Sequence, residues 1–154
     1  NNQIIRNIDS IAKGFSNVCE ATGLMGRWQQ IQENPIVICD TGHNEAGWKD
    51  LSLQIKNQKC LNLRIVFGMV DDKDIEAVMA LLPENAHYYW TQPSTKRAFA
   101  VAKIAEVGER YGLKGKAFTN VEEAYKQALS ESDEDDFIFV GGSSYVVADL
   151  LSKF

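Results

Sequence analysis

Polar, small and charged residues follow four apolar runs of this sequence, and their types suit an anionic ligand. One run ends at Asp40 and continues into Thr41-Gly42-His43-Asn44. An acid at this place can accept hydrogen bonds from the hydroxyl pair of a ribose, and the histidine can donate to a phosphate or carboxylate. The glycine lets the backbone approach a ligand, and Asn44 can cap a helix whose first amides attract anions. A plain helix cap at Asp40 or Asn44 is an equally weighted alternative.

Three further segments carry groups of the same kind, namely Gly68–Asp74, Thr91–Arg97 and Gly141–Ser144. Lys73 stands among three aspartates, where it could hold a substrate carboxylate or belong to an ordinary charge cluster at a helix start. Ser143 follows two glycines and could be a common N-cap or a group that meets a carboxylate or phosphate. Both interpretations stay open for each residue.

Arg27 follows Gly26 at an expected junction between two domains. Most lone arginines are solvated or paired on the surface, but a guanidinium at a junction could reach a phosphate chain with two hydrogen bonds. No Walker A sequence occurs in the chain, so the usual cradle for the phosphates of ATP is absent from it.

Apolar periodicity predicts the elements that would position these groups. We expect a hairpin with a turn at Glu33-Asn34-Pro35, then alternating strands and helices, with Asn120 as the N-cap of one helix. The alternation predicts a three-layer α/β/α fold around a mostly parallel six-stranded sheet with an antiparallel N-terminal edge strand. Strands are expected over residues 27–32, 36–39, 63–70, 87–91, 116–119 and 137–140, and helices over residues 3–22, 45–57, 72–82, 96–111, 121–129 and 143–152.

The predicted sheet brings the four polar segments together. Ligands of open α/β sheets bind beyond the carboxyl ends of the strands, and each segment follows such an end. The acidic stretch over residues 131–136 is instead predicted to be a solvated connector.

Composition narrows the class of protein. The formal charge of −5, from 16 basic and 21 acidic side chains, argues against a nucleic-acid partner or an acidic membrane surface. The cysteines, Cys19, Cys39 and Cys60, are odd in number and form no CxxC pair, which disfavours zinc and a disulfide framework. Cys39 should be buried, and a reducing, cytoplasmic setting fits best. The first residue is Asn1, and we expect the chain to be a piece of a longer protein.

Taken in order, the motifs resemble those of folylpolyglutamate synthases, which belong to the Mur ligase superfamily. The resemblance extends over residues 24–154 and departs from the family pattern at Thr41-Gly42, at Glu45 and at Lys96, where Gly-Ala, Pro and Pro are usual. It rests on Gly26-Arg27-Trp28-Gln29, Asp40-Thr41-Gly42-His43-Asn44, Gly68 with Asp72-Lys73-Asp74, Lys96-Arg97-Ala98 and Gly142-Ser143-Ser144-Tyr145.

The resemblance implies a C-terminal domain of a folylpolyglutamate synthase/dihydrofolate synthase, with a Rossmann-like Mur ligase fold over residues 24–154. Residues 1–23 would be a helix and hinge left from the preceding ATPase domain. Such an enzyme uses ATP and Mg to activate a folate or dihydropteroate carboxylate as an acyl phosphate, which the amine of L-glutamate attacks. The Mg ligands would lie in the N-terminal domain, so the isolated piece should be inactive.

The resemblance also implies roles for single residues and a set of partners. The partners would be the protein's own N-terminal domain, ATP, L-glutamate and a folate or dihydropteroate, in a monomer without nucleic acid or membrane. The implied roles are ATP contacts at Arg27 and Asp40, a catalytic position near the reacting phosphate for His43, glutamate contacts at Ser143 and Lys73, and support of the loops by Gly42, Asn44 and Arg97.

Three alternatives remain open from the sequence. The chain could belong to another Mur-type amide ligase, although Arg27-Trp28-Gln29 and Asp72-Lys73-Asp74 favour the folate branch. It could be a nucleotide- or amino-acid-binding module without catalysis, which would bind its ligand without a partner domain. It could also be a purely structural α/β domain, on which no ligand would have an effect.

Overall fold

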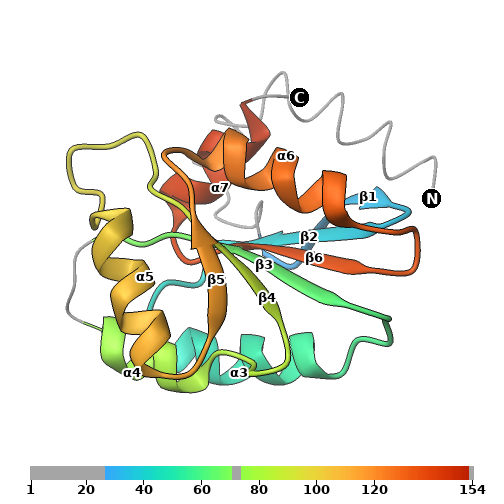
Figure 1. Cartoon of the computed structure of the whole chain (residues 1–154), viewed down its shortest axis with the longest axis horizontal. Helices are drawn as coiled ribbons and strands as arrows, with labels where there is room; N and C mark the ends of the chain where they lie inside the picture. The colour runs from blue at the N-terminus through green and yellow to red at the C-terminus, as the bar shows by residue number, and fades with distance from the viewer. Residues whose placement is uncertain (1–26, 71–73, 153–154) are drawn as a thin grey trace.

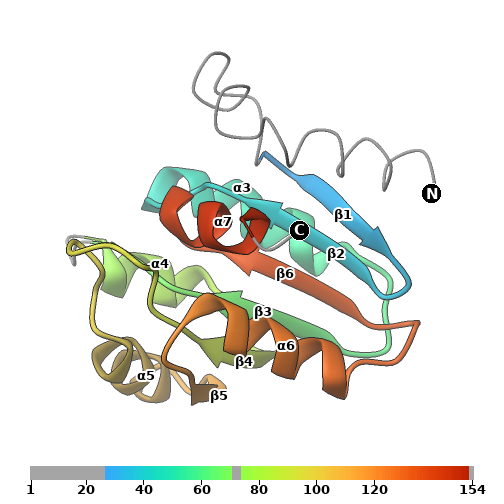
Figure 2. The same cartoon turned by 90° about the horizontal axis from the view of Figure 1, so that it is seen from above.

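The computed structural model describes residues 27–70 and 74–152 and shows one six-stranded sheet between two layers of helices (Figures 1 and 2). The strands are β1 Gln29–Glu33, β2 Ile36–Asp40, β3 Leu63–Phe67, β4 His87–Trp90, β5 Lys114–Ala117 and β6 Phe137–Gly141. The helices are α3 Glu45–Lys56, α4 Ile75–Leu81, α5 Val101–Arg110, α6 Val121–Glu131 and α7 Ser144–Leu151.

The sheet has the order β1-β2-β6-β3-β4-β5, and this arrangement confirms the predicted fold class. Strand β1 pairs antiparallel with β2, and every other pair is parallel. Strand β6 lies between β2 and β3, with Asp40 paired to Gly141 and Gly141 paired to Phe67. The carboxyl ends of the three central strands therefore meet at one edge of the sheet.

Apolar strands packed on both faces account for the layering. All five residues of β6 are buried, as expected for a strand covered by helices on both sides. Helices α3, α4 and α5 cover one face, where Trp48 lies edge-on to Phe67 with 5.6 Å between ring centroids and Tyr88 stacks on Trp90 at 4.7 Å. Helices α6 and α7 cover the other face. Burial of each large aromatic side chain contributes roughly 1.5–3 kcal/mol to folding.

The helix expected over residues 96–111 begins later, at Val101. The preceding residues are held by contacts outside the helix, because Ala98 forms an isolated antiparallel bridge with Val70. The first helical amide is then satisfied by a side chain, since Val101 N donates to Gln92 Oε1 at 3.0 Å. Tertiary pairing at the end of β3 thus overrides a sequence that has good helical periodicity.

Two strands are offset from their predicted ranges. Strand β3 ends at Phe67 rather than at residue 70, and β5 covers Lys114–Ala117 rather than residues 116–119. Glycine weakens an isolated strand, but Gly115 is needed in β5 because a Cβ there would lie 2.5 Å from Trp90 Nε1. The packing of the Trp90 ring against the backbone at Gly115 therefore sets the register of β5 on β4.

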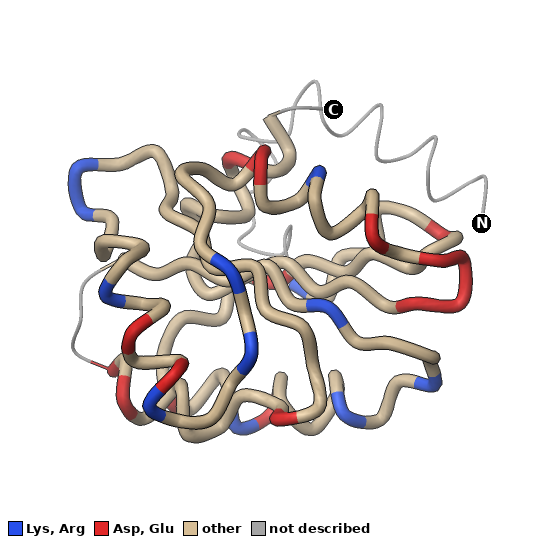
Figure 3. Tube along the Cα trace, viewed as in Figure 1, with Lys and Arg blue, Asp and Glu red and all other residues tan. Residues whose placement is uncertain are grey.

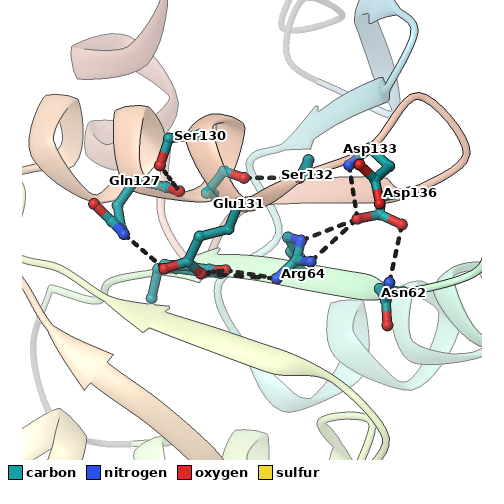
Figure 4. A network of polar contacts seen from close by, with 10 residues as sticks. Asn62, Arg64, Gln127, Ser130, Glu131, Ser132, Asp133 and Asp136 are labelled. Atoms are coloured by element: carbon teal, nitrogen blue, oxygen red, sulfur yellow. Dashed lines mark hydrogen bonds and ion pairs between the residues drawn. The ribbon is translucent and has the colours of Figure 1, made fainter.

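The acidic stretch over residues 131–136 is not simply a solvated connector, and that prediction is wrong at both ends. Its acidic residues gather at one end of the molecule (Figure 3), but Asp136 is buried and its carboxylate accepts from Arg64 Nη2 at 3.1 Å. Glu131 is the last residue of α6 and accepts a hydrogen bond from the hydroxyl of Tyr89. Figure 4 shows Arg64 lying between these two carboxylates.

Arg64 lies within the apolar strand β3, so its charge requires a buried partner. Desolvation alone would raise the pKa of Asp136, but hydrogen bonds from the Asp133 amide, Asn62 and Arg64 outweigh it and hold that pKa below its usual value. The network joins β3, β4, α6 and the start of β6 at the edge opposite to the carboxyl ends of the strands.

The remaining observations concern Cys39, the N-terminal residues and the length and polarity of the helices. Cys39 is fully buried, as predicted, and burial raises the pKa of its thiol to about 12. The helix expected over residues 3–22 and the domain boundary at residue 23 lie outside the described residues. Within the described part of the chain, every helix is too short or too polar to span a bilayer.

Candidate functional site

The carboxylate of Asp40 organises the loop that follows β2. Its Oδ1 accepts a hydrogen bond from Gly42 N and its Oδ2 accepts one from Trp28 N, each at 2.8 Å. An acid at the strand end thereby joins the loop after β2 to the residues that lead into β1. A carboxylate has about four lone-pair sites, so acceptor capacity remains for a ligand.

The next residues form a compact turn into α3. Asn44 is the N-cap, and its Oδ1 accepts from Gly47 N at 2.9 Å. The indole of Trp48 donates to Gly42 O at 3.1 Å. A Cβ on Gly42 would lie 2.6 Å from Leu51 Cδ1, so a larger residue at that position would require the Leu51 side chain to shift.

A pocket of about 350 Å³ opens beside this turn. Arg27, Asp40 and His43 line it together, as do Gly42 and Asn44. A volume of this size lies at the lower end of the range for small-molecule sites. A cation, an imidazole and a carboxylate around one pocket suit a ligand that carries phosphate and hydroxyl groups.

Four lining residues were not predicted from the sequence, and two of them carry polar side chains. Asp50 and Gln54 face the same pocket from α3. Their spacing from Gly47, by three and seven residues, places them on one face of a helix, so helical periodicity was the signal that could have identified them. Asp50 adds a second acid, which favours ligand groups that donate hydrogen bonds.

Ser143 lies at the same edge of the sheet but does not line this pocket. It is buried, caps α7, and its Oγ accepts from Val146 N at 3.2 Å. It comes two residues after Gly141, the partner of Asp40 in the sheet, while α7 and α3 lie on opposite faces (Figure 1). Arg27, Asp40 and His43 therefore lie together, whereas Ser143 follows the neighbouring strand.

The two remaining candidates lie elsewhere. Arg97 is exposed on the loop between β4 and α5, apart from the pocket. That loop is tied to α7 because Ser94 donates to Asp149 from both its amide and its hydroxyl, each at 2.7 Å. Lys73 lies outside the described residues. The structure therefore places Arg97 apart from the pocket beside Asp40 and leaves the place of Lys73 undescribed.

The described residues do not themselves suggest a metal site. Among residues 27–70 and 74–152, no group of three or more His, Cys, Asp or Glu side chains is arranged to hold a metal ion. The groups of the pocket that can meet a ligand are its own side chains and backbone amides.

Comparison with known proteins decides the family. Residues 26–144 match the family described as "Mur ligase, glutamate ligase domain". The chain belongs to this family. The matched range includes all the residues of the pocket, so the site lies within the Mur ligase domain itself.

Curated relatives of this Mur ligase domain include the dihydrofolate synthase/folylpolyglutamate synthase of Escherichia coli, 31% identical over 129 residues, 83% of this chain and 30% of that protein. A probable bifunctional folylpolyglutamate synthase/dihydropteroate synthase of Halobacterium salinarum is 30% identical over 146 residues, 94% of this chain and 17% of that protein. The domain thus spans less than a third of these relatives.

Solved structures are also similar to this chain. A folylpolyglutamate synthase/dihydrofolate synthase with Mn, AMPPNP and L-glutamate bound has a TM-score of 0.75 and 30% identity over 84% of this chain and 31% of that one. E. coli FolC in complex with DHPP and ADP has a TM-score of 0.77 and 29% identity, with 84% of this chain and 31% of that one covered.

Proposed function

We propose that this Mur ligase domain is the C-terminal domain of an ATP-dependent ligase that adds L-glutamate to dihydropteroate, to folates or to both. The observation that carries the proposal is the shared pocket of Arg27, Asp40 and His43 at the carboxyl edge of a sheet in this family. Relatives named for folate ligation, and a similar structure holding AMPPNP, Mn and L-glutamate, support the same chemistry.

The proposed reaction has two steps. The terminal phosphoryl group of ATP passes to the substrate carboxylate, which leaves ADP and an acyl phosphate. The amine of glutamate then attacks the acyl carbon and loses a proton, inorganic phosphate departs, and an amide bond forms. Closure of this domain over a preceding domain would exclude water from the acyl phosphate, which water would otherwise hydrolyse.

Each pocket residue has a role that follows from its chemistry. Arg27 would hold phosphate oxygens with two parallel hydrogen bonds, and Asp40 would accept from the ribose hydroxyls. His43 would donate a hydrogen bond near the transferring phosphoryl group, where negative charge has to be stabilised. Ser143, and Lys73 beyond the described residues, would meet the glutamate. The metal that accompanies ATP would be held by the preceding domain.

A ligation assay on the full-length protein tests the proposal. ADP release and glutamate incorporation would be measured with dihydropteroate and with reduced folates as the acid substrate. Arg27→Ala removes charge-assisted hydrogen bonds of about 1.5–3 kcal/mol, so kcat/KM for ATP should fall about 10- to 100-fold.

The matched control is Arg110→Ala. Arg110 is also exposed but is paired with Glu76 on the helices α4 and α5, so its loss should leave ligation unchanged. Wild-type kinetics for Arg27→Ala would remove the site assignment. Binding of ATP without ADP release, under all acid substrates, would instead identify a nucleotide-binding module without catalysis.

A further inference from the structure

Trp28 adopts a backbone conformation that needs support from its surroundings. Its φ angle is 45°, in the left-handed region that side chains with a Cβ rarely occupy. For a non-glycine residue this conformation costs about 1–2 kcal/mol. Trp28 therefore requires contacts elsewhere that hold it in place.

Two contacts anchor Trp28, one through its ring and one through its amide. The indole stacks on Phe137 with 6.2 Å between centroids and a 28° interplanar angle, and it lies at 6.2 Å from Phe139. The amide donates to Asp40 Oδ2 at 2.8 Å. The ring fixes the side chain in the core, and the carboxylate fixes the orientation of the peptide group.

That peptide group is the one that joins Arg27 to Trp28. Arg27 is exposed, and its guanidinium makes no hydrogen bond or ion pair with any residue of the described part of the chain. Its place on the pocket wall is therefore set by the backbone that carries it. The Asp40 carboxylate, which lines the same pocket, fixes the orientation of that backbone through the Trp28 amide.

The second oxygen of the same carboxylate has a parallel function. Asp40 Oδ1 accepts from Gly42 N at 2.8 Å, next to His43, which also lines the pocket. One carboxylate thus ties together the segment that carries Arg27 and the segment that carries His43. Two contacts with backbone amides on separate segments set the spacing of the guanidinium and the imidazole.

We propose that Asp40 is a positioning residue, which sets the Arg27 guanidinium for the phosphates of the nucleotide by holding the Trp28 amide. The inference rests on the proposed function and adds a second role to a residue expected to contact the ribose. Loss of the carboxylate would then act on phosphate binding through Arg27 and not only on the ribose.

A double-mutant cycle on the full-length ligase tests this inference. Asp40→Asn keeps the volume but removes one of the two acceptors, and Arg27→Ala removes the group to be positioned. Alone, Asp40→Asn should lower kcat/KM for ATP about 10-fold or more, the size of one charge-assisted contact. In the Arg27→Ala background the same change should lower it by a clearly smaller factor, because only the contact with the ribose then remains to be lost.

A second comparison uses 2′-deoxy-ATP, which lacks one ribose hydroxyl. If Asp40 acts through Arg27, a substantial part of the fold loss caused by Asp40→Asn should persist with 2′-deoxy-ATP. A contact with the ribose alone predicts that the loss shrinks with the deoxynucleotide. Additive effects in the cycle, or a loss confined to ATP, would overturn the positioning role.

One further measurement and two further variants complete the test of the positioning role. Hydrogen exchange of the peptide over residues 27–33 should be faster in Asp40→Asn, and unchanged exchange would contradict the inference. If that variant does not fold, Asp40→Glu keeps the charge and supplies the same cycle. Asp135→Asn makes the identical change at an exposed acid and should keep wild-type kinetics.

The result also separates this inference from the proposed function. Wild-type kinetics of Arg27→Ala would refute the ATP site itself. A loss in Arg27→Ala together with an additive cycle would refute only the positioning role of Asp40.

Discussion

Substitution of Gly142 by alanine should destabilise the domain far more than the small change in volume suggests. Gly142 joins β6 to the N-cap of α7, and its φ angle is +109°, which favours glycine strongly. An added Cβ would lie 2.1 Å from the carbonyl oxygen of Gly68. Because that oxygen belongs to the backbone at the end of β3, no side-chain rotation can relieve the contact.

The magnitude follows from two effects. An unfavourable backbone conformation costs about 1–3 kcal/mol. The chain must also move about 1 Å to relieve the contact, which weakens the neighbouring hydrogen bond from Gly68 N to Gly141 O and costs about 1 kcal/mol more. Alanine stabilises by about 0.4–1 kcal/mol through the unfolded chain, so the central value of the net loss is about 2 kcal/mol.

Urea unfolding followed by circular dichroism measures this loss, and thermal unfolding should show a fall in Tm of about 4–8 °C. The matched control is Gly112→Ala. Gly112 also has a positive φ, of +76°, but an added Cβ there would meet nothing within 4 Å. Its substitution should cost only about 1 kcal/mol.

The comparison between the two variants tests whether the contact with Gly68 contributes to the loss of stability. If Gly142→Ala and Gly112→Ala lower the free energy of unfolding by the same amount, the close approach to Gly68 contributes nothing and the packing argument is refuted.

Two other predictions concern buried polar groups. The pKa of Asp136 is depressed in the folded state, so its stabilisation is complete above its usual value of 3.8 and is lost as the pH falls through the lower folded pKa. Asp136→Asn should therefore lower the free energy of unfolding by about 3 kcal/mol at pH 7, and urea titrations should show that difference shrinking below pH 3.8; a constant difference would contradict the assignment. Cys39 should resist iodoacetamide at pH 8 while the part-exposed Cys60 reacts, and mass spectrometry of the labelled peptides would show equal labelling if this is wrong.

Local patterns predicted much of this fold because each depends on near neighbours in the chain. Apolar runs marked β2, β3 and β6, an alternating pattern marked β1, and polar caps marked helix starts, with Asn120 accepting from Glu123 N at 2.8 Å as expected. The antiparallel hairpin of β1 and β2 was also predicted, from an apolar run and a turn containing Pro35. Such features need no knowledge of distant packing.

Features that depend on distant contacts were missed. The start of α5 is set by a bridge between Val70 and Ala98, which local periodicity cannot report. Arg64 and Asp136 are 72 positions apart, so neither shows its partner in the sequence. A charge inside an apolar strand was nevertheless a usable signal, because burial of an unpaired guanidinium would be prohibitive.

The candidate site was predicted in part for the same reason. Asp40 and His43 follow one strand, so topology was enough to place them together, and Arg27 joins them because β1 pairs with β2. The hydrogen bond between Asp40 and the Trp28 amide could not be foreseen, since it depends on one backbone torsion.

The position of β6 has a consequence for how the protein is made. This strand comes last in the sequence and lies between β2 and β3, which have no other strand between them. During synthesis, the described residues before residue 137 can form a two-stranded ribbon of β1 and β2 and a separate three-stranded patch of β3, β4 and β5, both with open edges. The two parts of the sheet can join only after β6 has left the ribosome. A chain interrupted earlier therefore exposes unpaired strand edges to chaperones and proteases.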